Sequence, residues 1–281
     1  MSGAPSLADV VELLETWYPR DFAENWDRVG LVVGEDDAPV RSIVLAVDPT
    51  VAVADDAHDS DVLITHHPLL LRGASFLPAS TGKGAVVTRL IRSGTALWCG
   101  HTNADRAVTG TAIALADALD LTECRPLEPP RHEDERLFGL GMIAQLPEPT
   151  PVGELAARVA ALVPATVQGA KFTGDPDRAA STIALCPGAG DSLLGAAAAA
   201  GVDVYLTSDL RHHPALEHLE SAADPRAVPA LIDVPHYASE WMWLPVLARQ
   251  LEDAARERDW DLDVRISDVR TDPWTGSAPG R

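Results

Sequence analysis

The stretch Asp61-Val-Leu-Ile-Thr-His-His-Pro68 decides the fold class, because its short apolar run ends in two adjacent histidines. Val62 to Ile64 lack polar alternation, which is typical of a parallel strand covered on both faces. His66 and His67 then fall at the carboxyl end of the strand, where open α/β sheets bind ligands, and Pro68 ends the strand's hydrogen bonding. Successive side chains on a strand point to opposite sides, so the two histidines cannot share one ion without a turn between them, but they can bind two neighbouring ions. The alternative is a surface pair or a hydrogen-bonded core pair.

Composition excludes several classes of partner. The 281 residues include 22 basic and 42 acidic side chains, which gives a net charge of −20 and a pI near 4.6. Such a chain repels phosphate backbones and anionic lipids, so we predict neither a nucleic acid polymer nor a membrane as partner, whereas a small nucleotide stays compatible. The chain has three widely spaced cysteines, Cys99, Cys124 and Cys186, and no C-x-x-C motif. This argues against a thiolate zinc site and for a reducing compartment. Without a signal-like or membrane-length apolar segment, we expect a cytoplasmic protein.

The order of the predicted elements indicates an α/β fold, because strands alternate with helices as in a mostly parallel sheet. A proline-containing segment with mixed charge, 127–135, is interpreted as a linker between domains. We therefore predict a metal-binding α/β domain at 1–126 with 232–281, a second α/β domain at 127–231, and a disordered tail at 271–281. The predicted helices are 7–17, 52–58, 85–91, 111–121, 152–162, 192–200, 214–222 and 241–256. The predicted strands are 42–48, 62–64, 95–99, 137–146, 181–186, 202–207, 228–234 and 261–266.

A second predicted strand also ends in metal-capable side chains, in Gly100-His101-Thr-Asn-Ala-Asp105. His101 and Asp105 are four residues apart, which places both on one face if a helical turn begins there. A capping role for Asn103 or Asp105 is the alternative. Asn25 and Asp27, in a polar cluster earlier in the chain, are interpreted as turn residues.

A third strand ends in Asp233-Val-Pro-His236-Tyr-Ala-Ser-Glu240. His236 and Glu240 are again four apart at the start of a helix, so they can share a metal, and a carboxylate there can bridge two ions. A further group, Asp209, His212 and His213, has two possible roles. These residues could line a pocket, or they could cap the next helix and lie on its surface.

The three strand ends together supply four histidines and two carboxylates. Carboxyl ends of parallel strands meet at one edge of a sheet, so these groups are expected to converge. A nitrogen-rich set of this kind suits two borderline divalent ions, Zn, Mn, Fe or Co, better than Ca or Mg, which prefer oxygen.

These motifs resemble those of the Nif-three-like dinuclear-metal-centre proteins, also known as type 2 homologues of GTP cyclohydrolase I. The resemblance covers nearly the whole chain. It implies two interlinked α/β domains, a homo-oligomer in the form of a hexameric ring, and no cofactor beyond two metal ions per chain. It also implies the metal ligands His66, His67, Asp105, His236 and Glu240, with His101 beside the ions. The matching motifs are Asn25-Trp-Asp-Arg-Val-Gly-Leu31, Thr65-His-His-Pro68, His101-Thr-Asn-Ala-Asp105 and His236-Tyr-Ala-Ser-Glu240.

The resemblance suggests a metal-dependent hydrolase that opens the guanine ring of GTP, in which the ions acidify a water molecule. Glu240 and His101 are then the predicted catalytic residues, Glu240 as a bridging ligand and His101 as a proton carrier. A metal-binding scaffold or metallochaperone without turnover is one alternative, and a metal-dependent phosphoesterase is another. Arg72, Lys83 and Arg106 are the cations closest in sequence to the motifs and the candidates for binding a nucleotide.

Overall fold

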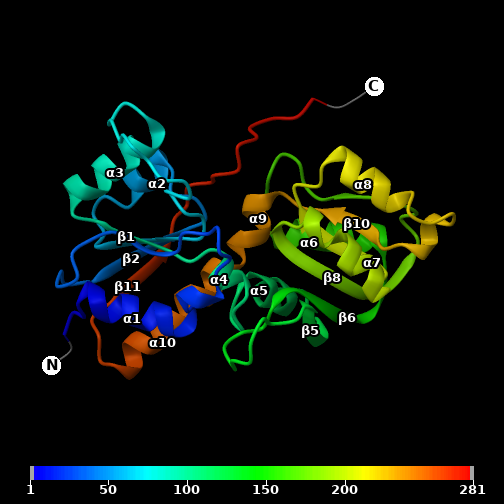
Figure 1. The fold of residues 1–281 in the computed structure, drawn as a ribbon, viewed down its shortest axis with the longest axis horizontal. Coiled ribbons are helices and arrows are strands. Elements are labelled where there is room, and N and C mark those ends of the chain that lie inside the picture. Colours follow the sequence, from blue (N-terminus) through cyan, green and yellow to red (C-terminus); the bar gives the residue numbers. More distant parts are fainter. Residues whose placement is uncertain (1–2, 279–281) are drawn as a thin grey trace. The chain divides into compact units, whose positions relative to one another are not determined.

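The computed structural model describes residues 3–278, which form two compact units (Figure 1). Unit 1 comprises residues up to Thr109 together with Leu244–Thr271, and unit 2 comprises Gly110–Trp243 together with the residues from Asp272 onward. The units are interlinked in sequence, as expected, because unit 1 combines an N-terminal segment with a C-terminal one. The division that we predicted, 1–126 with 232–281 and 127–231, stays a prediction about domains.

Unit 1 is built on a five-stranded sheet with the order β1-β4-β3-β2-β11. Three of its four strand pairs are parallel, and only β1 runs antiparallel to its neighbour. The parallel strands are short apolar runs, and β3 and β4 are buried along their whole length, as expected of strands covered on both faces. The bounds are β1 Gly30–Val33, β2 Ser42–Ala46, β3 Val62–Thr65, β4 Ala96–Cys99 and β11 Asp263–Ile266.

Helices cover both faces of this sheet (Figure 1). On one face lie α2, Val51–Asp56, and α3, Gly82–Ser93, whose Val53, Val86 and Leu90 pack on the strands. On the other lie α1, Leu7–Trp17, and α10, Trp243–Glu257. The α1 bounds are those predicted from its capping box, in which the Ser6 and Asp9 side chains each accept a hydrogen bond from the other residue's backbone.

The register of β3 and β4 brings two predicted site segments together. Thr65 pairs with Cys99 at the carboxyl ends of the strands, so His66 and Gly100 leave the sheet next to each other. After β4 the chain enters the short helix α4, Thr102–Asp105. The Asp105 N–H donates to the carbonyl of His101 at 3.0 Å, which confirms the helical turn that the four-residue spacing predicts.

Unit 2 contains a six-stranded mixed sheet with the order β5-β6-β8-β9-β10-β7. The central strands β8, β9 and β10 are parallel, and the three remaining pairs are antiparallel. This confirms an α/β protein, with one sheet mostly parallel and the other mostly antiparallel. The bounds are β5 Thr122–Glu128, β6 Leu140–Pro151, β7 Lys171–Phe172, β8 Ala179–Ala189, β9 Val204–Ser208 and β10 Ala230–Asp233.

The helices of unit 2 are short. Leu194 and Ala197 of α7 pack against Tyr205 and Ala184 of the sheet. The sequence interpretation of 127–135 as a linker was wrong at its start, because residues up to Glu128 belong to β5, an edge strand with mostly exposed side chains and little hydrophobic signal. The helix bounds are α5 Thr111–Ala118, α6 Val152–Leu162, α7 Leu194–Ala200, α8 His212–Leu219 and α9 His236–Trp241, with single 3₁₀ turns at Arg20–Phe22, Asp191–Leu193 and Pro225–Ala227.

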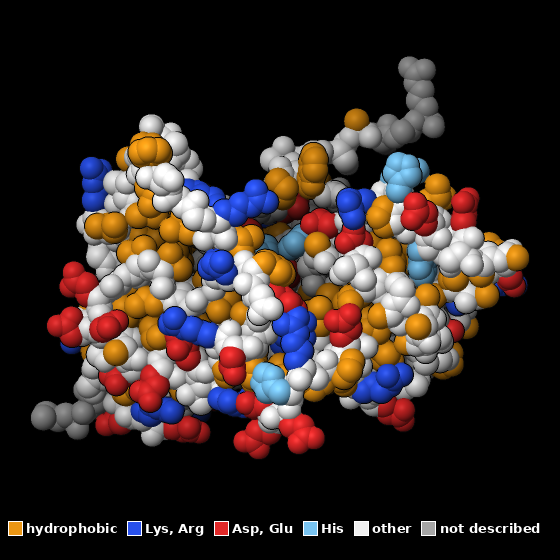
Figure 2. All heavy atoms as spheres, viewed as in Figure 1, with side chains coloured by type: hydrophobic (Ala, Val, Ile, Leu, Met, Phe, Trp, Pro, Cys, Tyr) orange, Lys and Arg blue, Asp and Glu red, His pale blue; other side chains and the backbone are white. Residues whose placement is uncertain are grey.

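The face drawn in Figure 2 has acidic, basic and hydrophobic side chains. Acidic and basic side chains are interspersed over the face drawn in Figure 2, so on this face the negative charge is spread rather than gathered in one patch. Among residues 3–278, no helix has both the length and the hydrophobicity to cross a membrane. Of the predicted disordered tail, 271–278 contains neither helix nor strand, and 279–281 lie outside the described residues.

Candidate metal centre

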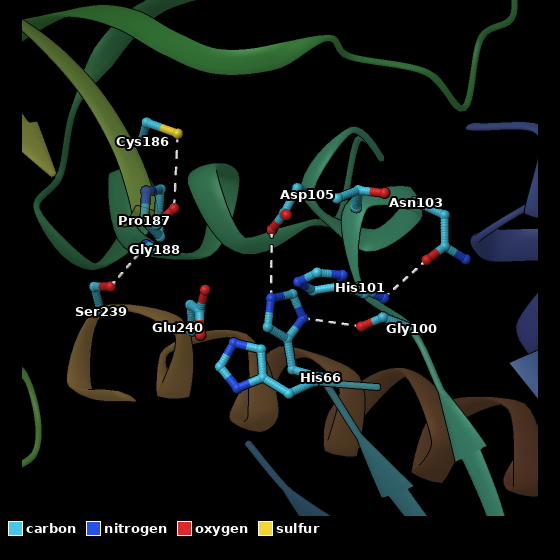
Figure 3. Close-up of polar contacts among 12 residues, drawn as sticks. His66, Gly100, His101, Asn103, Asp105, Cys186, Pro187, Gly188, Ser239 and Glu240 are labelled. Atoms are coloured by element: carbon cyan, nitrogen blue, oxygen red, sulfur yellow. Dashed lines mark hydrogen bonds and ion pairs between the residues drawn. The ribbon is translucent and has the colours of Figure 1, made fainter. Parts of the chain in front are cut away.

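His66 lies just beyond β3 and is fully buried. Its backbone N–H donates to Ala46, and its ring Nδ1 donates to the carbonyl of Gly100 at 2.9 Å (Figure 3). A carbonyl oxygen only accepts, so Nδ1 carries the hydrogen and Nε2 is the nitrogen that can bind a metal. Asp105 Oδ1 lies 3.6 Å from this Nε2 (Figure 3).

His67 is oriented by a carboxylate. Its Nδ1 donates to Asp48 Oδ1 at 2.7 Å, and its carbonyl accepts from the Thr65 hydroxyl at 3.0 Å. The other oxygen of Asp48 accepts a hydrogen bond from the hydroxyl of Thr271, on the segment after β11. Asp48 follows β2, so the carboxyl ends of three neighbouring strands contribute to this part of unit 1.

His101 is held in the same way by Asp27. Its Nδ1 lies 2.9 and 3.0 Å from the two oxygens of that carboxylate, which also accepts from the Thr102 backbone N–H at 3.0 Å. Burial of Asp27 by itself raises its pKa, but hydrogen bonds from His101, Thr102 and the Arg28 backbone, with the charge of His101, outweigh burial and lower the pKa to about 2. Asp27 is therefore ionised near neutral pH and accepts from His101.

His66, His67 and His101 form a triad, because their ligand atoms all lie within 4.8 Å of one another. Because β3 ends at Thr65, the alternation of a strand no longer applies to His66 and His67, and both can face one ion. A group of three imidazoles at this spacing can hold one metal ion.

Unit 2 holds the other predicted pair. His236 begins α9, and its Nε2 lies 2.9 Å from Glu240 Oε1 one turn later, as the spacing predicts. Its Nδ1 donates to Asp209 Oδ2 at 2.7 Å. Asp209, whose role the sequence left open, thus orients a candidate ligand, whereas His212 and His213 are exposed at the start of α8.

Gly188, at the end of β8, makes room for the Glu240 carboxylate. A Cβ atom at Gly188 would lie 2.4 Å from Glu240 Oε1, and its backbone has a φ of +75°, which favours glycine. The Gly188 N–H donates to the Ser239 hydroxyl at 3.0 Å (Figure 3), and that hydroxyl donates to the carbonyl of His236 at 2.9 Å. The Gly188 backbone and the Ser239 side chain therefore fix the start of α9, which carries His236 and Glu240.

The donor set of both units fits borderline divalent ions. In each of the four histidines a carbonyl or carboxylate lies within hydrogen-bond distance of Nδ1, which is the arrangement found around protein-bound metals. No thiolate takes part, because the Cys99 thiol donates to the carbonyl of His66 at 3.2 Å and burial raises its pKa well above the ordinary value. Imidazole and carboxylate suit Zn, Mn, Fe or Co.

Sequence reasoning missed the residues that orient the ligands. Asp27 was interpreted only as a turn residue, and Asp48 and Gly188 were not considered as parts of the site. Asp48 follows β2 directly, so the strand-end argument used for His66 could have found it. The capping role considered for Asn103 was wrong, because the N-cap of α4 is His101 and no side chain caps it; the Asn103 side-chain oxygen instead accepts from the His101 N–H at 2.9 Å.

Comparison with known proteins identifies the family of the chain. The family model described as Duf34/NIF3 (NGG1p interacting factor 3) matches residues 5–273. The chain belongs to this family. The NIF3-family protein of Streptomyces coelicolor named "GTP cyclohydrolase 1 type 2 homolog" is 46% identical over 280 residues, which cover 98% of this chain and 96% of that protein.

Another NIF3-family relative, from Mycobacterium tuberculosis, bears the same name and is 34% identical over 372 aligned positions, covering 95% of this chain and 96% of that protein. The alignment exceeds the 281 residues of this chain, so that relative contains residues that this short form lacks. Among solved structures, a Staphylococcus aureus protein has a TM-score of 0.86 at 26% identity, covering 96% of this chain and 99% of that one. A Bacillus cereus protein related to NIF3 has the same fold at 21% identity, with a TM-score of 0.86 and coverage of 98% and 100%.

Proposed function

We propose that this NIF3-family protein is a metal-dependent hydrolase that binds two divalent ions and acts on a purine nucleotide. The observation that carries the proposal is the common orientation of four imidazoles, each with Nδ1 beside a carbonyl or carboxylate, which is the arrangement found around metal-binding histidines. The name shared by the relatives, GTP cyclohydrolase 1 type 2 homolog, supports a purine nucleotide as the substrate class.

The proposed ligands are those that the family resemblance implies. When bound, the ions supply Lewis acidity, which polarises the substrate and favours ionisation of a water molecule. Zn, Mn, Fe and Co are the candidate metals. The ligands are His66, His67, Asp105, His236 and Glu240.

The protein's own side chains orient the ligands and move the proton. His101 is the proposed proton carrier, because the Asp27 carboxylate beside its Nδ1 fixes the orientation of the ring. Glu240 offers two carboxylate oxygens, one of them beside His236 Nε2, and therefore suits the role of a ligand shared by two ions. Gly188 leaves the space that this carboxylate occupies.

A metal-binding scaffold or metallochaperone is the second candidate, and one observation favours it. Of the three cations proposed for nucleotide binding, Arg106 is buried and forms an ion pair with Glu24 at 2.5 Å. It therefore stabilises the fold around α4 and is unsuited to a triphosphate. Arg72 and Lys83 remain as candidates for binding a nucleotide. Lys83 and His67 both line a pocket of about 430 Å³.

A metal count tests the dinuclear centre. Purified chain loaded with Zn or Mn should contain two ions per chain, and His67→Ala or Glu240→Ala should reduce that number. His213→Ala is the matched control, since this exposed histidine is outside the proposed ligand set, and it should keep both ions. One ion per chain, unaffected by Glu240→Ala, would instead favour a mononuclear phosphoesterase.

An activity screen separates the hydrolase from the scaffold. Metal-loaded protein is incubated at micromolar concentration with GTP and with simple phosphoesters, and the products are followed by ring-opening absorbance changes and phosphate release. Turnover of GTP that depends on the metal and is lost in Glu240→Ala supports the proposal. Intact GTP and intact phosphoesters, with two ions bound, would leave the scaffold as the better explanation.

We also propose that the chain forms a homo-oligomer, a hexamer, as its family resemblance implies. Light scattering coupled to size exclusion gives the mass in solution directly. A monomer of 29.8 kDa at micromolar concentration would contradict this.

A further inference from the structure

An exposed indole lies beside the histidine triad of unit 1. The Trp26 residue is 55% exposed, although it is one of the largest apolar side chains of the molecule. Its ring centroid lies 5.9 Å from that of His101, with the two planes at 76° in an edge-to-face arrangement. A half-exposed aromatic side chain beside polar groups offers an apolar face to the ring of a ligand.

The segment that carries Trp26 is fixed on both sides. Before it, the Glu24 backbone N–H donates to the Thr102 hydroxyl at 2.9 Å. After it, the Asp27 N–H donates to the Glu24 carbonyl at 2.9 Å, and the Asp27 carboxylate accepts from the Thr102 N–H. The backbone that carries the indole is therefore held beside Thr102 before any ligand arrives, which lowers the entropy lost on binding.

We infer that Trp26 is a stacking platform for the planar ring of the substrate and places that ring beside the triad. This rests on the proposed function, because it takes a purine as the ring. An aromatic face binds any base through stacking, and removal of such a platform by alanine weakens binding by about 5- to 150-fold. Trp26 does not contact phosphate in this arrangement, so the phosphates of a nucleotide are recognised elsewhere on the protein.

The test uses the metal-loaded full chain and three probes: GTP, guanosine and inorganic tripolyphosphate. Trp26→Ala should weaken the binding of GTP and guanosine by about 5- to 150-fold, whereas tripolyphosphate binding should change less than about twofold. Trp26→Phe retains an aromatic face and should recover most of the affinity. Ligand-induced quenching of tryptophan fluorescence should also fall in both variants.

Trp274→Ala is the matched control, because Trp274 is the other tryptophan more than half exposed, at 60%. It should bind all three probes as the wild type does. Metal content and oligomer mass are measured for every variant, so that an effect on folding or assembly is recognised.

The outcomes separate this inference from the proposed function. Nucleotide binding that depends on Trp26, without any turnover, would support the platform and contradict the hydrolase. Turnover of GTP with unchanged affinity in Trp26→Ala would overturn the platform and leave the hydrolase intact. The platform is also overturned if wild-type protein binds neither GTP nor guanosine, or if Trp26→Ala disrupts the oligomer and leaves binding unchanged.

Discussion

Asp27 and His101 form a paired carboxylate and imidazole in which Nδ1 of His101 lies 2.9 and 3.0 Å from the two oxygens of Asp27. The carboxylate is buried and ionised, since hydrogen bonds overcome the effect of burial and lower its pKa to about 2. The pair therefore sets both the tautomer and the direction of the ring, and it does so from a segment more than 70 residues earlier in the chain.

Replacing Asp27 with Asn should weaken metal binding at the triad. The amide has no negative charge and can present its NH₂ group to Nδ1, so His101 loses its fixed tautomer, and we expect the affinity to fall by about 10- to 100-fold. Competition between the protein and a chromogenic chelator for Zn measures it. Asp36→Asn, at an exposed position, is the control. Equal affinity in both variants would show that Asp27 only stabilises the turn.

Replacing Asp48 or Thr271 tests how His67 is oriented. Asp48→Asn removes the carboxylate that accepts from Nδ1, so we expect a loss of about 10- to 100-fold in metal affinity. Thr271→Val removes only the hydroxyl bonded to the other oxygen of Asp48, and its effect should be a few-fold. The same chelator competition ranks the two variants. An effect of Thr271→Val as large as that of Asp48→Asn would mean that the segment after β11 holds the carboxylate in place.

Gly188→Ala should disturb the His236 and Glu240 pair selectively. The added Cβ would lie 2.4 Å from Glu240 Oε1, and alanine is strained at a φ of +75°. The carboxylate must therefore move, and we expect fewer than two ions per chain by elemental analysis. Gly195→Ala is the control, because a Cβ at Gly195 in α7 meets no atom within 4 Å. Full metal content in Gly188→Ala would show that Glu240 is not a ligand.

Asp203→Asn should reduce stability in a pH-dependent way. Burial raises the pKa of Asp203, but hydrogen bonds from the Ser181 and Thr182 backbone and from the Thr182 hydroxyl outweigh it and lower the pKa below its ordinary value of 3.8. The unfolded chain thus binds the proton first as the pH falls, so the stabilisation is complete above about pH 5 and is lost below 3.8.

Urea unfolding measures this effect. At pH 7 we expect Asp203→Asn to lower the free energy of unfolding by roughly 1 kcal/mol, since hydrogen bonds to a charged group are lost and partial exposure screens them. The difference from wild type should shrink as the pH falls below 3.8. A difference that is the same at pH 7 and pH 3 would mean that the charge of Asp203 does not stabilise the strand ends. The exposed Asp37→Asn serves as control.

Local sequence patterns were sufficient for elements whose start and period are encoded within a few residues. The helices Leu7–Trp17 and Val152–Leu162 have the predicted bounds, because each has an apolar repeat of about four residues. The strand β5 was not predicted and its last two residues were assigned to the linker, since exposed side chains and Pro126 give this strand no such repeat and only its pairing with β6 defines it. Pairing between strands is a long-range property, and a short window of sequence does not contain it.

The sequence by itself determined which side chains could bind metal, because His66, His101 and the His236/Glu240 pair each follow an apolar strand at its carboxyl end. Only the tertiary structure decided how each ring is oriented, since the groups beside the Nδ1 atoms, Asp27, Asp48, Asp209 and the Gly100 carbonyl, come from other parts of the chain. A carboxylate or carbonyl can hold an imidazole only within about 3 Å, and folding brings these distant groups to that distance.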